Sequence, residues 1–238
     1  DAMRAVYYET HGDAEVLQVG ELNKPACGDD QVLVEVAAAG VNPIDRRLRA
    51  GELQEYIQRT FPVTPGFDLS GRIVEVGDAV TGWQVGDEIM GLAFTWSIQH
   101  GTYAEFAPVD AGAIAPKPVN ASFEQAAGIP LVSLTAWQSL LEFGQLGPGK
   151  TVLIQAGAGG VGSVAIPMAK HLGATVYTTA SAANTDYVRS LGADVVIDYQ
   201  KDSYERAILE AEPDGVDMVL EALLGDGTDE AAVRITKS

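Results

Sequence analysis

The sequence predicts an α/β protein in which a β-rich domain, residues 1–124, is followed by a domain built on a parallel sheet, residues 125–238. Three observations support this prediction. Short runs of β-branched and aromatic residues, separated by turn-forming clusters, fill the first half of the chain. From Ser122 onward, strand-like and helix-like stretches alternate, which is typical of a parallel sheet with crossover helices. A glycine-rich turn joins the first strand of this second half to its first helix.

The first half contains short apolar runs that we interpret as β-strands. Turn clusters such as His11-Gly-Asp13 and Val85-Gly-Asp87 separate them. Many short strands at regular intervals predict a closed or partly closed barrel. The expected strands cover residues 4–8, 17–21, 31–39, 71–76, 88–91 and 103–108.

The second half begins where Ser122 can cap a helix that starts at Phe123. A further helical stretch, residues 134–143, leads through a glycine- and proline-rich connector into the alternating region. A complete sheet of this type has about six strands. We count about four and therefore expect the chain to be truncated at its C-terminus. The expected strands cover 151–156, 175–179, 195–197 and 216–221, and the expected helices cover 163–172, 184–191 and 203–210.

Composition and charge limit the possible partners. The chain has 238 residues, of which 47% are hydrophobic and 20% charged, as in soluble globular proteins. A net charge of −18 argues against nucleic acid and anionic membrane surfaces, because both require a basic face. The single cysteine, Cys27, excludes an intrachain disulfide and favours a reducing cytoplasm. We find no signal peptide, and the longest apolar window, about residues 152–169, is too interrupted to span a membrane.

The strongest functional signal is the turn Gly157-Ala158-Gly159-Gly160-Val161-Gly162. It follows an apolar strand and opens a helix, which is the context in which Gly-x-Gly-x-x-Gly binds a dinucleotide. The first glycine allows the turn, the second lets a pyrophosphate approach the backbone, and the third lets the helix pack close to the strand. The helix contributes free N–H groups and the positive end of its dipole. We interpret this region as a Rossmann-type nucleotide site; the alternative is a glycine-rich turn without a ligand.

The end of the next strand bears on the choice of dinucleotide. NAD-binding proteins place an acidic residue about 20 positions after the glycine turn, where it accepts the ribose hydroxyls. Residues 177–184 contain no Asp or Glu. This absence favours NADPH, because a carboxylate there would repel the 2′-phosphate. Thr179 and Ser181 could donate hydrogen bonds to that phosphate, more weakly than a cation would, or they could be ordinary loop residues.

Several further motifs, in the same order, resemble the medium-chain dehydrogenase/reductase superfamily, above all its zinc-free quinone oxidoreductase (zeta-crystallin-like) branch. The resemblance extends from Met3 to about Leu224 and implies a GroES-like barrel followed by a Rossmann-type domain. The motifs that carry it are Gly40-Val-Asn42-Pro-Ile-Asp45, Pro65-Gly-Phe-Asp68-Leu-Ser-Gly71, Val85-Gly-Asp87-Glu-Ile-Met-Gly91, Gly101-Thr-Tyr-Ala-Glu-Phe106, Leu134-Thr135-Ala-Trp137, the glycine turn and Leu191-Gly-Ala-Asp194.

The resemblance also implies that zinc is absent. The alcohol dehydrogenase branch holds its catalytic zinc with Cys, His and Cys, and the matching positions here are Asn42, Phe67 and Leu131. Phenylalanine and leucine cannot ligate a metal.

Without a Lewis acid, reduction of an activated acceptor is easier than oxidation of an alcohol. Conjugation in a quinone or an α,β-unsaturated carbonyl spreads the charge that hydride delivers. We therefore expect an NADPH-dependent reductase of such acceptors. The alternatives are a non-catalytic NADPH-binding or redox-sensing protein and an enoyl reductase domain of a synthase.

The resemblance assigns roles to individual residues, each with a simpler alternative. Asn42 is expected at the cofactor and substrate, or as an Asn before Pro that fixes a turn. Thr135 is expected near the nicotinamide, or as a helix hydroxyl bonded to backbone. Tyr56 and Trp96 could line the acceptor pocket or serve packing. Asp45 is expected to cap a short helix.

The remaining predictions concern the 2′-phosphate and the assembly. Tyr199 matches a tyrosine that packs near this phosphate, and Asn184 falls where some relatives have a phosphate-binding lysine. Asp68 could be structural. We expect a cytoplasmic homodimer. The predicted catalytic residues are Asn42, Thr135 and Tyr56, and the predicted cofactor contacts are Asn42, Thr135, Gly157, Ala158, Gly159, Gly160, Val161, Gly162, Thr179, Ser181, Asn184 and Tyr199.

Overall fold

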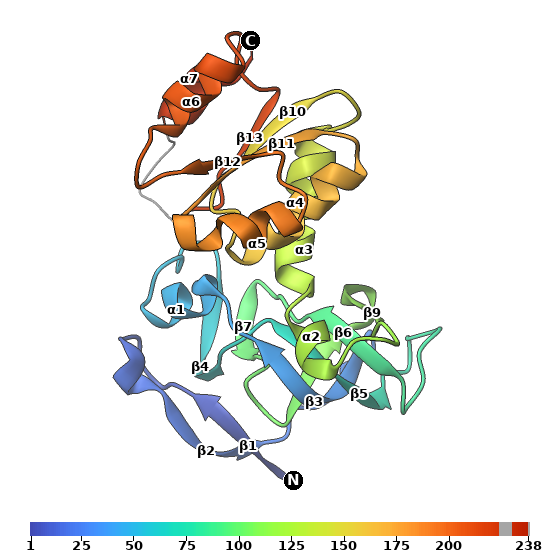
Figure 1. Cartoon of the computed structure of the whole chain (residues 1–238). Helices are drawn as coiled ribbons and strands as arrows, with labels where there is room; N and C mark the ends of the chain where they lie inside the picture. Colours follow the sequence, from blue (N-terminus) through green and yellow to red (C-terminus); the bar gives the residue numbers. More distant parts are fainter. Residues whose placement is uncertain (224–229, 238) are drawn as a thin grey trace. The chain divides into compact units, whose positions relative to one another are not determined.

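The computed structural model describes residues 1–223 and 230–237. The chain divides into two compact units, Asp1–Leu131 and Val132–Ser238 (Figure 1). From the sequence we placed the boundary after residue 124. The difference is helix α2 (Phe123–Ala127), which packs on strands of the first unit. Ser70 Oγ donates a hydrogen bond to the Phe123 carbonyl at 2.5 Å, which ties α2 to that unit.

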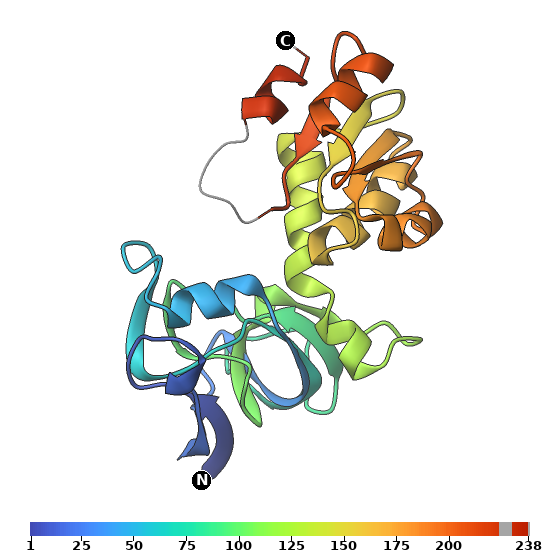
Figure 2. The same ribbon diagram turned by 60° about the vertical axis from the view of Figure 1, so that its left-hand side comes forward.

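The first unit is built on a five-stranded antiparallel sheet that curves around an apolar core (Figure 2). Each run expected as a strand in this half overlaps an observed strand. The sheet has the order β8 (Phe106–Asp110), β3 (Gln31–Gly40), β5 (Asp68–Val76), β6 (Glu88–Leu92) and β9 (Ile114–Pro116). Two further pairs join β1 (Ala2–Tyr7) to β2 (Gln18–Asn23) and β4 (Gln58–Thr64) to β7 (Ser97–His100).

The helices of the first unit are short. Helix α1 (Pro43–Arg49) starts with a proline, whose missing N–H and fixed φ suit the first helical position. Short 3-10 turns lie at Ala14–Val16 and Ala111–Ala113.

The second unit contains a four-stranded parallel sheet, in agreement with the number of parallel strands expected from the sequence. Its order is β12 (Val195–Asp198), β11 (Thr175–Ala180), β10 (Thr151–Ile154) and β13 (Met218–Leu220). The helical segments are α3 (Pro130–Trp137), which begins in the first unit, a π-helix (Gln138–Phe143), α4 (Gly160–His171), a 3-10 turn (Ala182–Asn184), α5 (Thr185–Ser190), α6 (Tyr204–Ala211) and α7 (Glu230–Arg234).

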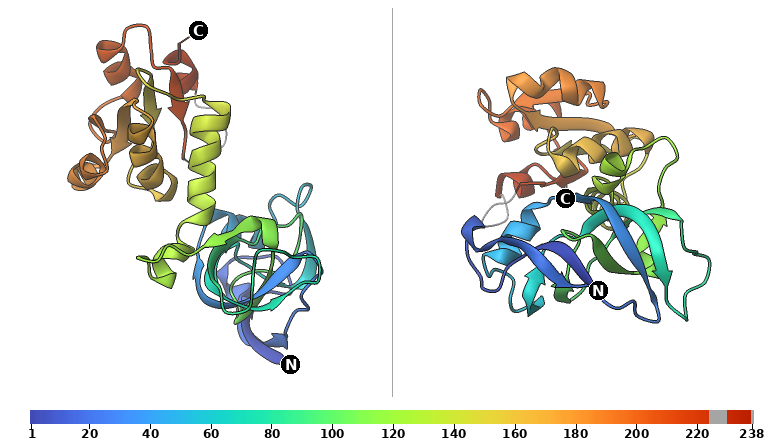
Figure 3. Two further views of the ribbon diagram at one scale, coloured as in Figure 1. Left: turned by 90° about the vertical axis from the view of Figure 1, so that its right-hand side faces the viewer. Right: turned by 90° about the horizontal axis from the view of Figure 1, so that it is seen from below.

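Helices cover both faces of this parallel sheet (Figure 3). Successive residues of a strand point to opposite faces. Accordingly, Val152 and Ile154 pack in one cluster with Ile166 of α4, whereas Leu153 packs in another with Ile208 of α6. The sheet is therefore buried on both sides, and its loops carry the polar groups available to a ligand. Within the described residues, no helix has the length and apolar character needed to cross a membrane.

Candidate nucleotide-binding and active site

The glycine turn connects β10 to α4, as expected, and two of its glycines are required by close packing. A Cβ at Gly157 would overlap Thr178 Oγ1 on the neighbouring strand. A Cβ at Gly162 would overlap the carbonyl oxygen of Ala156. The left-handed conformation of the turn falls on Ala156, with φ 51°, and not on a glycine. Gly157 thus allows the turn by leaving space for Thr178, and Gly162 lets α4 start close to β10.

The middle of the turn is open on its outer side. Gly159 and Gly160 are exposed, and a Cβ at Gly159 would meet only Ala156 among the described residues. Gly159 is the N-cap of α4, whose first N–H groups have no intrahelical partner. The first turn of α4 contains no acidic residue. These residues fit a dinucleotide, because a diphosphate needs a close backbone approach and unopposed N–H donors.

Three of the predicted phosphate contacts lie at the carboxyl edge of the parallel sheet. Ser181 directly follows β11, and Asn184 Nδ2 donates to Ser181 Oγ at 3.3 Å. Tyr199 follows β12, the neighbour of β11, and is 58% exposed. Thr179, in contrast, is buried, and its Oγ1 accepts a hydrogen bond from the Ala156 N–H at 2.9 Å. The Thr179 hydroxyl therefore holds the glycine turn in place.

Sequence reasoning missed one cation at this edge. Lys201 lies two residues beyond Tyr199 and forms an ion pair with Asp198, with Nζ and Oδ2 3.4 Å apart. Its side chain is 76% exposed. Its signal in the sequence is that it lies two residues beyond Tyr199, the residue expected near the 2′-phosphate.

In the first unit, Asn42 lies at the junction of β3 and α1 in a network of buried hydrogen bonds. Its Nδ2 donates to Asp68 Oδ2 at 2.9 Å, and its backbone N–H donates to Asp45 Oδ2 at 2.8 Å. Tyr103 donates its hydroxyl to the same Asp45 oxygen at 2.7 Å. The other Asp68 oxygen, Oδ1, accepts the Leu131 N–H at 2.8 Å. The sequence placed Asp45 as the cap in front of a helix at residues 46–49, but α1 begins at Pro43 and its N-cap is Asn42. Asp45 takes part in the cap from inside the first turn, where its carboxylate accepts the Asn42 N–H.

The two carboxylates of this network have perturbed acidities. Burial raises the pKa of Asp45, and hydrogen bonds from the Asn42 N–H and Tyr103 partly oppose this rise. Burial likewise raises the pKa of Asp68, against hydrogen bonds from Asn42 and the Leu131 N–H. The pKa of Tyr103 is raised by burial and by its hydrogen bond to Asp45. The network therefore places two buried carboxylates beside the Asn42 amide and the Tyr103 hydroxyl.

The other predicted residues are more exposed. Tyr56 and Trp96 are each 68% exposed, and their segments meet where the Gln58 N–H donates to the Trp96 carbonyl at 2.8 Å. The structure thus brings these two aromatic residues onto neighbouring segments of the first unit. Thr135 is exposed on α3, in the second unit. None of the described residues form a group of three or more His, Cys, Asp or Glu that could hold a metal ion.

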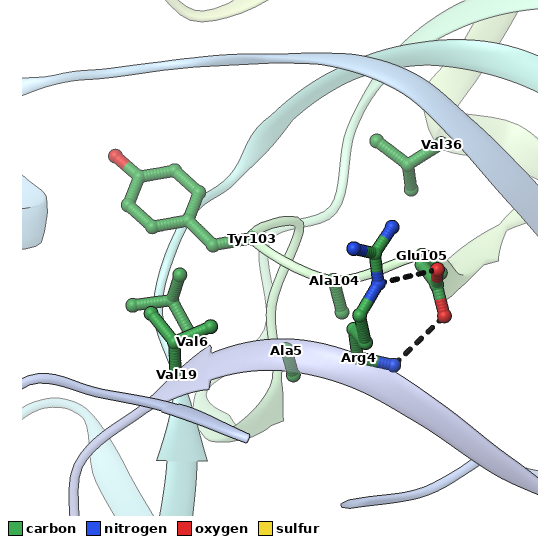
Figure 4. Close-up of a pocket in the computed structure, with 8 residues that line it drawn as sticks. All are labelled: Arg4, Ala5, Val6, Val19, Val36, Tyr103, Ala104 and Glu105. Atoms are coloured by element: carbon green, nitrogen blue, oxygen red, sulfur yellow. Dashed lines mark hydrogen bonds and ion pairs between the residues drawn. The ribbon is translucent and has the colours of Figure 1, made fainter. Parts of the chain in front are cut away.

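A hollow on the first unit, about 290 Å³ in volume, includes none of the predicted site residues (Figure 4). Arg4 closes one side of it, because its Nε and backbone N–H both contact the Glu105 carboxylate. The Tyr103 ring lines another part of the hollow, while its hydroxyl bonds to Asp45.

Comparison with known proteins identifies the family. Residues 28–119 match the family model described as alcohol dehydrogenase GroES-like domain, and residues 160–238 match the model described as zinc-binding dehydrogenase. The fold and these matches define a medium-chain dehydrogenase/reductase, with a GroES-like domain and a Rossmann-like parallel sheet.

Individual relatives place the chain more narrowly. It is 38% identical to the chloroplastic NADPH-dependent alkenal/one oxidoreductase of Arabidopsis thaliana, over 99% of this chain and 60% of that protein. The quinone oxidoreductase structure from Coxiella burnetii is 35% identical, with a TM-score of 0.83 over 94% of this chain and 70% of that one. The Escherichia coli quinone oxidoreductase in complex with NADPH is 28% identical, with a TM-score of 0.85 over 98% of this chain and 70% of that one.

The chain belongs to the quinone oxidoreductases of this superfamily, which confirms the family resemblance seen in the sequence. The chain spans about 60% of the length of curated relatives such as this alkenal/one oxidoreductase.

Proposed function

We propose that this protein is an NADPH-dependent oxidoreductase that reduces a quinone or an α,β-unsaturated carbonyl by hydride transfer without zinc. The observation that carries the proposal is the glycine turn before α4, which leaves an exposed backbone at Gly159 and no acidic residue in the first helical turn. The relatives include proteins named as alkenal/one and quinone oxidoreductases, and these names support the choice of acceptor.

The proposed roles of the residues follow from what such a reduction requires. The bound nicotinamide would supply the hydride. The protein must orient the acceptor and offer a hydrogen bond where negative charge develops on oxygen. We assign contacts with the cofactor or substrate to Asn42 and Thr135, and contacts with the acceptor to Tyr56. The backbone of residues 157–162 would bind the pyrophosphate.

At the adenosine end, we assign the 2′-phosphate to the edge formed by Ser181, Asn184 and Tyr199. Ser181 and Asn184 supply neutral donors, and Tyr199 supplies an exposed ring at the end of the adjacent strand. Thr179, included among the contacts expected from sequence, would act through the turn that its hydroxyl holds.

We further propose that the protein works as a homodimer in the cytoplasm; the single cysteine supports a reducing compartment. Several plant relatives carry chloroplastic names, so the compartment needs its own measurement. Sedimentation of the purified protein would test the dimer, and cell fractionation would test the location. A monomer, or enrichment in an organelle, would contradict these two points without affecting the proposed reaction.

The test of the reaction combines binding and turnover. We expect the purified protein to bind NADPH more tightly than NADH and to oxidise it, followed at 340 nm, in the presence of quinones or enals. Gly159→Val should weaken NADPH binding at least about tenfold, because loss of hydrogen bonds to a charged group costs roughly 1.5 kcal/mol or more.

Gly147→Ala is the matched control, since a Cβ there meets nothing within 4 Å. Wild-type affinity in the Gly159 variant would contradict the assignment of the pyrophosphate. NADPH binding without turnover on any acceptor would favour the non-catalytic alternative.

A further inference from the structure

Asp68 is a carboxylate buried at the start of β5, with 2% of its surface exposed. No ion pair among the described residues involves it. Each of its oxygens accepts one hydrogen bond, Oδ1 from the Leu131 backbone and Oδ2 from the Asn42 side chain. Burying a charge is costly unless hydrogen bonds or an ion pair compensate it, and here the compensation comes from these two hydrogen bonds.

The orientation of the Asn42 amide follows from what Asp68 and its other partner, the Leu131 N–H, can offer. The Leu131 N–H is a backbone donor and cannot change its polarity. A carboxylate offers an acceptor on both oxygens, whereas an amide offers one acceptor and one donor. Once Leu131 engages one oxygen, the other can face only a donor. The Asn42 amide must therefore turn its Nδ2 toward Asp68.

The Asp68 side chain has little freedom to move away from this arrangement. Asp68 pairs with Gly40 in the β3–β5 ladder, and Asn42 follows two residues later in the chain. A Cβ at Gly40 would lie 2.7 Å from the Asp68 Cβ and 2.6 Å from the Ala127 carbonyl oxygen. The Asp68 side chain thus lies packed between β3 and the segment that carries Leu131.

We propose that Asp68 is a positioning residue that holds the side-chain amide of Asn42 in one of its two orientations, which differ by a half-turn about χ2. The amide then directs its carbonyl oxygen away from Asp68, toward the Asp45 N–H of the capping box, and the direction of its second N–H is fixed with it. The backbone of Asn42 is held separately, by Asp45. The proposal rests on the role of Asn42 in the proposed function, because the orientation matters only where the amide contacts cofactor or substrate.

Two variants separate this role from general support of the fold. In Asp68→Asn, the introduced amide keeps an oxygen for the Leu131 N–H and directs its NH₂ group at Asn42. Two donors would then face each other, so the Asn42 amide must turn over. In the double variant Asn42→Asp with Asp68→Asn, the introduced carboxylate accepts from the introduced amide. An oxygen then returns to the side that Asn42 Oδ1 occupies in the wild type.

The measurements are the dissociation constants of NADPH and of adenosine 2′,5′-bisphosphate, the steady-state kcat with one enal, and the melting temperature. Adenosine 2′,5′-bisphosphate lacks the nicotinamide half and reports on the glycine turn and phosphate edge alone. For Asp68→Asn, we expect NADPH affinity or kcat to fall about tenfold, with unchanged affinity for the bisphosphate, as for loss of one hydrogen bond to a ligand. The double variant should return to within about threefold of wild type.

Ser70→Ala serves as the matched control, because it removes a partly buried hydrogen bond of the same strand without touching Asn42. It should lower the melting temperature but leave the ratio of the two dissociation constants unchanged.

Three outcomes overturn the proposal. Wild-type NADPH affinity and kcat in Asp68→Asn, alongside an impaired Asn42→Ala, would overturn it while keeping the role of Asn42. Wild-type values in Asn42→Ala would overturn both. If Asp68→Asn does not fold, the double variant decides: a folded double variant that binds the bisphosphate but not NADPH would overturn the proposal, and recovery of NADPH binding would support it.

Discussion

At the scale of single residues, the first unit keeps two carboxylates, Asp45 and Asp68, out of water and without a cation among the described residues. Burial raises the pKa of both, and the Asp45 charge contributes to the rise at Asp68. Hydrogen bonds offset part of the cost of burial: both Asp68 oxygens and Asp45 Oδ2 accept them, whereas Asp45 Oδ1 is buried without a partner among the described residues. Their protonation nevertheless links folding to pH.

Asp45 gives a prediction with a definite sign. The folded protein holds the Asp45 proton more tightly than the unfolded chain does, because its pKa is raised above the ordinary value of 3.8. Its contribution to the free energy of unfolding is therefore present below about pH 4 and is lost as pH rises through the raised pKa. Asp45→Asn removes this titration. We expect the free energy of unfolding of the variant, relative to that of the wild type, to increase between about pH 4 and about pH 7.

Urea titrations of both proteins at several pH values measure this shift. A constant difference from lost hydrogen bonds to Asn42 or Tyr103 does not affect the test, because only the change with pH counts. A shift in favour of the wild type with rising pH would contradict the buried, raised pKa of Asp45.

Residue-level reasoning from sequence found the groups that act locally and missed those that depend on tertiary contact. A capping role for Asp45 was predicted because capping joins residues close in sequence, although the helix begins three residues earlier than expected and its N-cap is Asn42. The contacts of Asn42 with Asp68 and of Asp45 with Tyr103 join residues 26 and 58 apart. No local pattern reports such pairs, since they follow from strand pairing and from the path of the loops.

At the scale of elements, apolar periodicity predicted all strands of the parallel sheet and most strands of the first unit, but it missed three described strands. The missed ones are β4, β7 and β9. Strand β4 contains Pro62, which argues against a strand in the sequence, and β9 has three residues. Both are recognised as strands only through their partners, β7 and β6.

The glycine turn between β10 and α4 gives a prediction about how tightly it packs against β11. We expect Gly157→Ala to cost about 1–3 kcal/mol of stability, because the new Cβ overlaps Thr178 Oγ1. Part of this cost should disappear in the background of Thr178→Ala, which removes the obstructing hydroxyl. Gly162→Ala should show no such relief in the same background, since its Cβ overlaps the backbone carbonyl of Ala156.

Double-mutant cycles from urea unfolding measure both couplings. Additive effects of Gly157→Ala and Thr178→Ala would mean that the turn moves away from β11 instead of pressing on it. Equal relief at Gly157 and Gly162 would indicate a general loosening of the unit.

At the scale of the whole molecule, the net charge of −18 opposes the ligand that the glycine turn is suited to bind. NADPH is an anion, so the long-range field of the protein repels it before any local donor acts. The N–H groups at the start of α4 act over the first helical turn only. The long-range field of the protein therefore repels NADPH during its approach, whereas the local field at the start of α4 attracts the bound diphosphate.

This opposition predicts an unusual salt dependence. Salt screens the long-range field, with a Debye length of about 10 Å at 0.1 M, and affects short contacts in the bound state less. We expect the association rate constant of NADPH, measured by stopped-flow fluorescence, to rise about two- to fivefold between about 10 mM and about 300 mM sodium chloride. The kcat/KM for an uncharged quinone at saturating NADPH is the control and should stay nearly constant. A rate constant for NADPH that falls with salt would show that a locally positive field steers the cofactor, and the open backbone at Gly159 would then have to act together with side-chain cations such as Lys201.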